Sequence, residues 1–412
     1  MEYHYPKFTP EMKKTHTILI PNMAVTQFRL MEYALRCEGY KCELLGNCGS
    51  AVAQLGLKYV HNDTCYPALL VIGQFLDALN SGKYDLEHTA LLITQTGGGC
   101  RASNYIHLLR KALVKAGYPN IPVASLNFSG LEKDSGFQMT LPLARRAIAS
   151  VFYGDMLCAL RNQVAPYENE KGAADRMVDL WVERLGRVLL AGKGFTAREM
   201  KHTFPLVAKD FAAIPVTRVP KVKVGVVGEI YVKYSPLGNN DLQKFLESQD
   251  CEVNFPGLMG FVQYCAYNPS ETARLYGGTF LEKHVSDVIL KYIESMESVL
   301  IRVLKENGFH APLPFRELVK LTEEAFHWKR TTAHNVLRRL CDKGLFRNDN
   351  GTVTSLISRD EFYAMQSRQF VEDTFEGSLP AFLAAFTKDR ALTAEEAAKI
   401  RRMIDEAEGG KE

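Results

Sequence analysis

A strand, a glycine triplet, a cysteine and a helix follow one another in the stretch LLITQTGGGCRASNYIHLLRKAL, residues 91–113. Its apolar start is typical of a short buried strand, and apolar residues at helical spacing follow Cys100. In α/β proteins, ligands bind at the sheet edge where strands end and helices begin. The stretch therefore predicts an α/β fold with Cys100 at a ligand-binding edge.

The residues around Cys100 suit a reactive sulfur. Backbone N–H groups and the dipole of the following helix stabilise a thiolate, and Arg101 adds positive charge. Gly98 and Gly99 let the backbone approach whatever the sulfur binds. A buried cysteine beside a tight turn is the plainer alternative. A phosphate loop is a weaker one, because the GxxxxGK[ST] spacing is absent.

Strands and helices alternate on both sides of this stretch. The pattern predicts strands at 17–20, 41–45, 90–95 and 121–126, with a helix at 25–37 between the first two. Such alternation favours a parallel, helix-flanked sheet.

A second cysteine occupies an equivalent place. Cys65 comes just before an apolar helix predicted at 68–79, as Cys100 comes before its own helix. Soft thiolates at one sheet edge suit zinc or an iron–sulfur cluster. We expect Cys65 and Cys100 to be the metal ligands, with Gly98, Gly99 and Arg101 completing the cofactor site. The three cysteines with uncommon C-x4-C-x5-C spacing are expected to be structural: Cys37, Cys42 and Cys48.

Length, charge, cysteine number and apolar runs restrict the class of protein. The chain has 412 residues, a net charge of +3 and nine cysteines, an odd number. The first residues lack the apolar core of a signal peptide, and no apolar run is long enough to span a bilayer. These features predict a cytoplasmic protein with reduced or metal-bound thiols and no membrane partner.

The middle of the chain changes pattern twice. Residues 137–213 are helical and mixed in charge, and their scattered arginines, Arg146 and Arg161 among them, are expected on a solvated face. A strand predicted at 221–227, a helix at 241–247 and a strand at 252–253 then begin a second α/β domain.

Four blocks of the first 320 residues carry a family resemblance. They read IPNM at 20–23, NDTCYPALLVIGQFLDAL at 62–79, QTGGGCRASNY at 95–105 and VGEIYVKYSPLGNNDLQKFLE at 227–247. Residues 1–320 resemble the 2-hydroxyglutaryl-CoA dehydratase component family, and most closely the acyl-CoA dehydratase activase-related proteins.

The resemblance implies a four-iron, four-sulfur (4Fe-4S) cluster held by three cysteines, with Cys65 and Cys100 on the first two motifs. It also implies an activator ATPase that supplies an electron and an acyl-CoA thioester that loses water. The family's third motif, a Gly-Cys-Leu-Pro-like stretch, has no counterpart here. Cys251 and Cys265 lie in the corresponding domain, which is apparently truncated.

A basic helix is predicted at 327–340. Its apolar stripe would face a core, while polar and basic side chains crowd its start and outer face. Residues 345–356, with Asn350-Gly351 at the centre, predict a two-stranded wing. A recognition helix in a DNA major groove needs such donors. The expected DNA contacts are Lys329, Arg330, Thr331, Thr332, His334, Asn335 and Arg338. An ordinary helical hairpin with a solvated basic face is the alternative.

Two further blocks, WKRTTAHNVLRRLCDKG at 328–344 and the helical sequence at 358–406, carry a second resemblance. Residues 295–408 resemble the BlaI/MecI penicillinase-repressor family. This implies a winged helix-turn-helix that binds operator DNA and C-terminal helices, at 357–408, that form a homodimer. Residues 296–325 align with either family, so the junction lies within that interval.

The predicted organisation has five segments. They are a complete α/β domain at 1–135, a helical segment and linker at 136–220, a truncated α/β domain at 221–294, a winged helix-turn-helix at 295–356 and a dimerisation arm at 357–412. The dehydratase resemblance covers more of the chain than the repressor resemblance does. It therefore favours a dehydratase-type iron–sulfur protein fused to a DNA-binding domain. The alternative is a BlaI/MecI-type repressor with an N-terminal α/β sensor domain.

Overall fold

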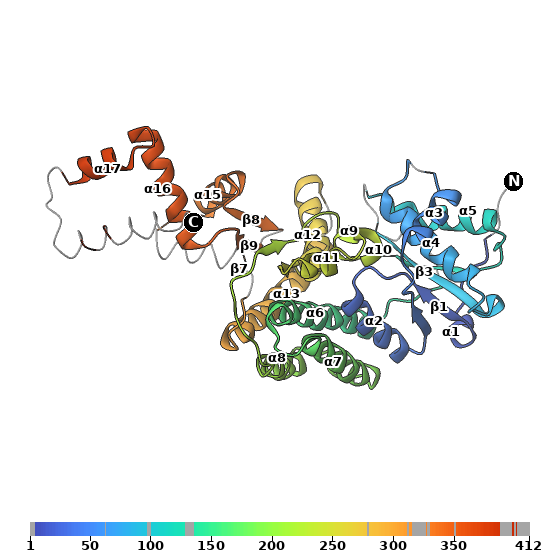
Figure 1. The fold of residues 1–412 in the computed structure, drawn as a ribbon. Coiled ribbons are helices and arrows are strands. Elements are labelled where there is room, and N and C mark those ends of the chain that lie inside the picture. Colours follow the sequence, from blue (N-terminus) through green and yellow to red (C-terminus); the bar gives the residue numbers. More distant parts are fainter. Residues whose placement is uncertain are drawn as a thin grey trace. The chain divides into compact units, whose positions relative to one another are not determined.

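The computed structural model describes residues 5–61, 63–96, 100–127, 136–277, 280–310, 313–314, 327, 330–349, 352–387, 398 and 401. The chain divides into two compact units, residues 1–311 and residues 312–412 (Figure 1). Among the helices of the described segments, none is both long and apolar enough to cross a membrane.

The first unit contains a four-stranded parallel sheet. Its strands are β1 (Thr17–Ile20), β2 (Lys41–Leu44), β3 (Thr89–Gln95) and β4 (Val123–Asn127). They lie in the order β2-β1-β3-β4. The parallel sheet predicted from the alternating pattern is thus confirmed. Six of the seven β3 residues are buried, as expected for a central strand covered on both faces.

Helices flank this sheet. They are α1 (Met12–Thr15), α2 (Val25–Cys37), α3 (Ser50–Tyr59), α4 (Tyr66–Asn80) and α5 (Tyr105–Ala116), with short 3-10 helices η1 (Leu86–His88) and η2 (Arg101–Asn104). Helices α3 and α4 pack at backbone distance. A Cβ atom at Gly56 would lie 2.1 Å from the Leu69 carbonyl oxygen, and one at Gly73 equally close to that of Val52. Only glycine fits at these two positions.

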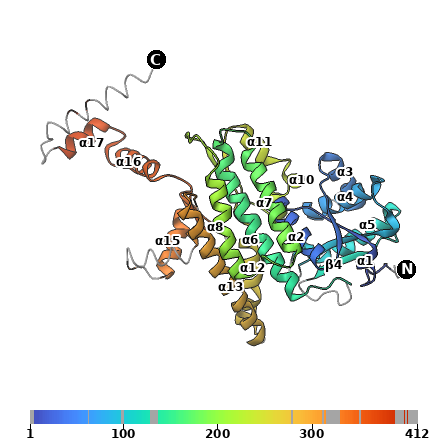
Figure 2. The ribbon, with the colours of Figure 1, turned by 90° about the horizontal axis from the view of Figure 1, so that it is seen from below.

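A helical layer follows in the chain, as predicted for 137–213. It consists of α6 (Leu141–Val164), η3 (Ala165–Tyr167), α7 (Ala173–Leu190) and α8 (Ala197–Ala212), and α6, α7 and α8 lie side by side (Figure 2). Two of its arginines are not on a solvated face. The side chains of Arg146 and Arg161 are only 11% and 15% exposed. Arg146 pairs with Glu38, and Arg161 pairs with Asp175 and Glu247, which offsets the cost of burying their charge.

The second α/β half of the first unit has a two-stranded parallel sheet. Its elements are β5 (Lys223–Gly225), α9 (Ile230–Tyr234), α10 (Pro236–Asn239), α11 (Leu242–Ser248), β6 (Glu252–Asn254), α12 (Met259–Tyr276) and α13 (Phe280–Glu306). β5 is shorter than the strand predicted at 221–227. Tyr231 and Leu237 are buried in the same core as α4 and β3, so the two halves share one interior.

The second unit contains a small antiparallel sheet and three described helices. Its elements are β7 (Leu313–Pro314), α15 (Arg330–Asp342), β8 (Phe346–Asp349), β9 (Thr352–Ser355), α16 (Arg359–Phe375) and α17 (Leu379–Phe386). The strands lie in the order β7-β9-β8. The pairing of Asp349 with Thr352 makes β8 and β9 a hairpin, as predicted. Its turn, Asn350-Gly351, lies outside the described residues.

Candidate functional site

The four sequence blocks that carry the first resemblance meet at the carboxyl edge of the first sheet. Asn22, directly after β1, donates its N–H to Gln74 Oε1 on α4 at 3.1 Å. The hydroxyl of Ser235, in the second α/β half, donates to the Asn22 carbonyl oxygen at 3.5 Å. The Cys100 loop follows β3 at this edge, and the Cys65 loop, which connects α3 to α4, is joined to it by a hydrogen bond from Arg101 to the Asp63 carbonyl oxygen.

Cys65 has a direct polar partner. It stands at the N-terminus of α4, and its Sγ shares a 2.6 Å hydrogen bond with the Tyr105 hydroxyl. Burial, then this hydrogen bond, raise the pKa of Tyr105, and the charges of Cys65, Cys100 and Glu229 add to the effect. The phenol therefore stays protonated and can donate to the sulfur. The sequence pattern did not indicate the Tyr105 hydroxyl or Glu229 as neighbours of the cysteines.

The Cys100 loop is tied to the Cys65 loop. Arg101 donates through Nη1 to the Asp63 carbonyl oxygen at 2.6 Å. Cys100 is exposed and precedes η2, and the hydroxyl of Ser103 donates to its carbonyl oxygen. Arg101 thus links the two loops. Gly98 and Gly99 lie outside the described residues.

The second α/β half holds Cys265, an exposed cysteine on α12. Partial burial of its sulfur, then the charge of Cys100, raise the pKa of its thiol. Cys251, the other candidate from the sequence, donates to the carbonyl oxygen of Gln249 in its own loop. No three His, Cys, Asp or Glu side chains among the described residues converge closely enough to bind a metal ion.

Of the cysteines expected to be structural, Cys42 is buried on β2. Burial raises the pKa of its thiol to about 12. Such a thiol stays protonated and is a poor metal ligand.

The predicted DNA-contacting residues fall on one helix of the second unit. The backbone of α15 begins at Arg330 and includes Thr331, Thr332, His334, Asn335 and Arg338. Arg338 is exposed, and Leu337, beside it, is 3% exposed and faces the unit's interior. Lys329 lies outside the described residues. So do the side chains of Arg330, Thr331, Thr332, His334 and Asn335.

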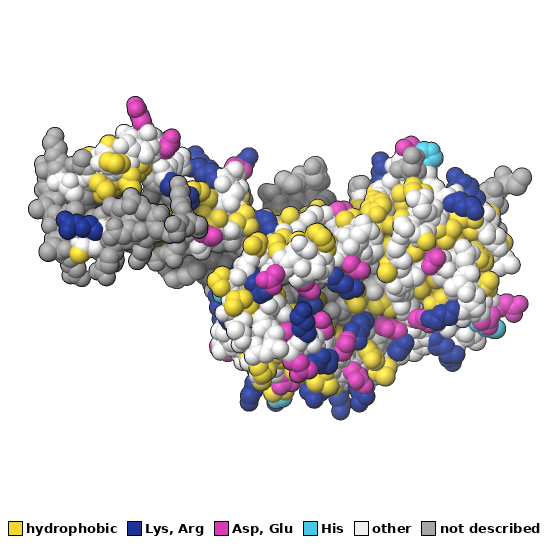
Figure 3. Space-filling view, viewed as in Figure 1, with side chains coloured by type: hydrophobic (Ala, Val, Ile, Leu, Met, Phe, Trp, Pro, Cys, Tyr) yellow, Lys and Arg dark blue, Asp and Glu magenta, His cyan; other side chains and the backbone are white. Residues whose placement is uncertain are grey.

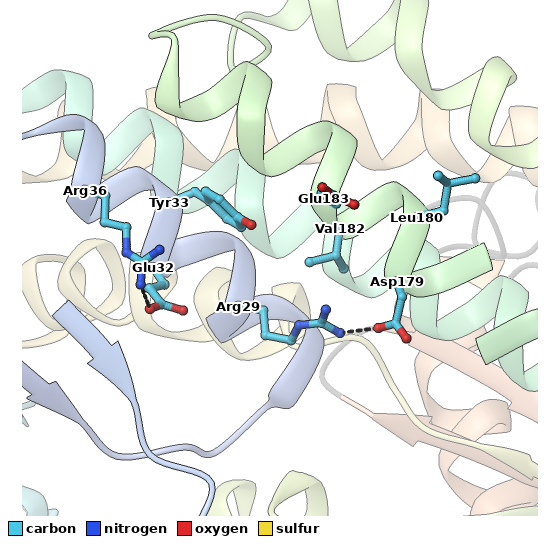
Figure 4. Close-up of a pocket in the computed structure, with 8 residues that line it drawn as sticks. All are labelled: Arg29, Glu32, Tyr33, Arg36, Asp179, Leu180, Val182 and Glu183. Carbon is cyan, nitrogen blue, oxygen red and sulfur yellow. Dashed lines mark hydrogen bonds and ion pairs between the residues drawn. The ribbon is translucent and has the colours of Figure 1, made fainter. Parts of the chain in front are cut away.

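A polar groove of about 370 Å³ lies between α2 and α7, away from the thiols (Figure 4). Arg29 Nη1 pairs with Asp179 Oδ1 at 2.6 Å, and Arg36 Nη2 pairs with Glu32 Oε1 at 2.5 Å. Both arginines that line the groove are therefore paired with neighbouring carboxylates.

The surface charge of the first unit is mixed. Lys and Arg side chains alternate with Asp and Glu on the face seen in Figure 3. A face that binds a nucleic-acid backbone is dominated by positive charge. Positive charge does not dominate this face of the first unit.

Comparisons with known proteins bear on the second unit. Residues 293–406 match the family model of the penicillinase repressor. No curated protein and no solved structure matches the chain. The resemblance of residues 1–320 to the dehydratase components, with its activator ATPase and acyl-CoA partners, gains no support from them. The chain therefore contains a penicillinase repressor domain at residues 293–406.

Proposed function

We propose that the protein is a DNA-binding transcriptional repressor of the BlaI/MecI type with an N-terminal α/β domain. The observation that carries this proposal is the penicillinase repressor match over 293–406. The order of elements agrees with it, since α15 is followed directly by the antiparallel hairpin β8–β9. A helix followed by a hairpin is the arrangement of a winged helix-turn-helix, in which the helix enters the major groove.

The DNA contacts are assigned to the start and outer face of α15. Lys329 and Arg330 contact phosphates, while Thr332, Asn335 and Arg338 lie nearer to base edges. Phosphate contacts position the protein and give a salt dependence, whereas base contacts give sequence preference. Thr331 and His334 are further donors on the same helix.

Dimerisation is assigned to α16 and α17. Tyr363, Phe370 and Leu379 are 53%, 53% and 54% exposed. The rings of Phe370, Phe375 and Phe382 pack at centroid distances of 5.6–6.1 Å. Large apolar side chains that remain exposed on adjacent helices mark a surface for a partner. A second copy would bring two α15 helices to two half-sites.

The test begins with selection of tight-binding duplexes from a random pool by the full chain, followed by titration of the best duplex. Asn335→Ala should cost about 1–3 kcal/mol on the selected duplex and little on unrelated DNA. Lys329→Ala should weaken binding to all duplexes alike and reduce the salt slope by about one unit. Failure to enrich any sequence, with no duplex bound at low salt, would contradict the proposal.

A second candidate function is binding of a 4Fe-4S cluster at the thiols. It is favoured by the Cys65–Tyr105 hydrogen bond and by the link that Arg101 makes between the two cysteine loops. Cys65 and Cys100 would supply two ligands and Cys265 the third. Because these thiols do not converge on one point, the third ligand requires α12 to shift. Iron and labile sulfide measured after anaerobic purification test the idea. Equal contents in the wild type and in Cys65→Ser/Cys100→Ser would overturn it.

A further inference from the structure

Two histidines meet at the amino edge of the first sheet, opposite the edge that carries the Cys100 loop. His16 directly precedes β1, and His88 directly precedes β3. These strands are parallel neighbours, and Thr17 pairs with Thr89 in their register. The pairing therefore brings the two preceding residues together, although they are distant in the sequence. Their ring centroids lie 5.7 Å apart, with the ring planes inclined by 59°.

The ring of His88 is held in one orientation by a carboxylate. Its Nδ1 lies 2.8 Å from Asp85 Oδ2. Because an ionised carboxylate only accepts, Nδ1 carries the proton of the neutral ring and the lone pair lies on Nε2. The carboxylate is itself positioned, since Asp85 Oδ1 accepts the N–H of Glu87 at 3.1 Å. A histidine that binds a metal is commonly oriented by a carboxylate in this way.

The ring of His16 has a comparable contact. Its Nδ1 lies 2.9 Å from the hydroxyl oxygen of Thr15, which can accept the Nδ1 proton. His16 is half-buried, and the side chain of His88 is 55% exposed, so solutes can reach the pair. Because the polar contact of each ring is made by Nδ1, Nε2 is the nitrogen that can bind a ligand.

The separation of the rings suits one shared metal ion. Zinc binds a histidine nitrogen at about 2.1 Å in tetrahedral geometry, which places the centroids of two such rings roughly 5 Å apart. The observed 5.7 Å is close to this value, so small rotations of the two side chains would allow both to bind. Imidazole nitrogen suits Zn²⁺, Cu²⁺ and Ni²⁺, whereas Mg²⁺ and Ca²⁺ prefer oxygen ligands.

We propose that His16 and His88 bind one Zn²⁺ ion through their Nε2 atoms, and that Asp85 is a positioning residue for His88. Within the described part of the chain no three potential ligand side chains converge, so water completes the coordination. The ion joins the starts of β1 and β3. Its binding stabilises the folded first unit, because the unfolded chain does not hold the two rings together. This site is separate from the thiols and independent of the proposed repressor function.

The first test counts bound zinc by isothermal titration of the full chain with zinc chloride. At about pH 7.5 most imidazoles are neutral, because their ordinary pKa is near 6.5. His16→Gln and His88→Gln should each bind one ion fewer than the wild type. The control, His202→Gln, changes an exposed histidine on α8 and should leave the count unchanged. Thiols also bind zinc, so each variant is compared with the wild type.

The positioning role of Asp85 is tested by Asp85→Asn. Asparagine still accepts the N–H of Glu87, so the start of η1 is kept, but the negative charge beside His88 is lost. The variant should weaken zinc binding about tenfold. Glu87→Gln removes an exposed negative charge next to His88 in the sequence and should have no such effect. Equal losses of affinity in the two variants would overturn the role of Asp85.

A second readout uses the wild-type chain and does not depend on the folding of a variant. Diethyl pyrocarbonate transfers an ethoxycarbonyl group to an imidazole nitrogen and releases ethanol and carbon dioxide. Mass spectrometry of peptides measures the reaction at each histidine. Saturating zinc should block it at His16 and His88 but not at His202. Unchanged reaction at the pair, or the same zinc count in the wild type and both pair variants, would overturn the proposed site.

Discussion

The helices of the two units use their apolar side chains differently. Phe152, Phe204 and Phe211, on α6 and α8, are at most 1% exposed. On α16 and α17 of the second unit, Phe370 and Leu379 remain more than half exposed. The helical layer of the first unit therefore packs these rings within one chain, whereas α16 and α17 leave apolar side chains exposed that the proposed dimer would cover.

The largest effect on the free energy of unfolding is expected in the first unit's core. Phe204 is fully buried and its ring packs edge-on against Tyr153 at 5.6 Å. Phe204→Ala should lower the free energy of unfolding of the first unit by about 3–5 kcal/mol, since it removes buried contacts and leaves a cavity. Urea denaturation followed by tryptophan fluorescence measures this. Phe245→Ala, at a 59% exposed site, is the control. Equal losses in the two variants would contradict the assignment of the core.

The next effect concerns Asp155, a half-buried carboxylate on α6 beside that core. Burial raises the pKa of Asp155 to about 6, whereas an unfolded aspartate titrates near 3.9. The native state therefore binds a proton that the unfolded state lacks between these pH values. The Asp155 contribution to the free energy of unfolding falls as the pH rises from about 4 to about 6, by on the order of 2–3 kcal/mol, and is constant above.

Asp155→Asn removes this titration. The difference in unfolding free energy between the wild type and the variant should therefore fall across the same pH window. Glu297 is a nearby carboxyl that responds to the change. Burial raises its pKa, the hydrogen bond with Gln263 lowers it, and the charge of Asp155 raises it. Urea denaturation at pH 4, 5, 6 and 7 gives the four differences. A difference that is independent of pH would show that Asp155 is not a buried carboxyl.

A smaller effect is expected at the exposed aromatic surface. Phe370→Glu should weaken self-association at least about tenfold, because it places a charge in an apolar contact between copies. The unfolding of the first unit should not change. Sedimentation velocity over a concentration series measures the association. Arg347→Glu, on β8 of the same unit, controls for charge alone. Unaltered association of the Phe370 variant would place the dimer contact elsewhere.

The smallest effect is predicted at the groove between α2 and α7. Arg29 and Asp179 are 38% and 65% exposed, so their ion pair is screened by solvent. Arg29→Ala should change the free energy of unfolding by less than about 1 kcal/mol and leave DNA affinity unaltered. A loss of DNA affinity in this variant would show that the groove has a function in the full chain.

Local pattern predicted much of the fold. Helix α2 was predicted at its observed bounds. Its apolar residues recur at helical spacing, and Gly39, with a φ of 87°, follows its end. Helix α3 was missed, because Gly56 weakens its helical propensity. The reason for that glycine lies in α4, which approaches to backbone distance. A contact with a distant helix cannot be predicted from the sequence of the segment itself.

The candidate site was predicted only in part. Cys65 and Cys100 stand before helices, as expected, because the starts of helices can be recognised locally. The hydrogen bond between Tyr105 and Cys65 and the one from Arg101 to Asp63 depend on how distant segments pack. The burial of Arg146 beside Glu38 is a third example, since 108 residues separate the two.

Two copies of this chain should bind one duplex through their repressor domains. Native mass spectrometry of the full chain with the selected duplex measures the composition of the complex. The expected complex contains two chains and one duplex, which Phe370→Glu converts to one chain per duplex and Lys329→Ala weakens without changing its composition. A wild-type complex of one chain per duplex, or no complex in low salt, would show that the repressor does not bind as a dimer.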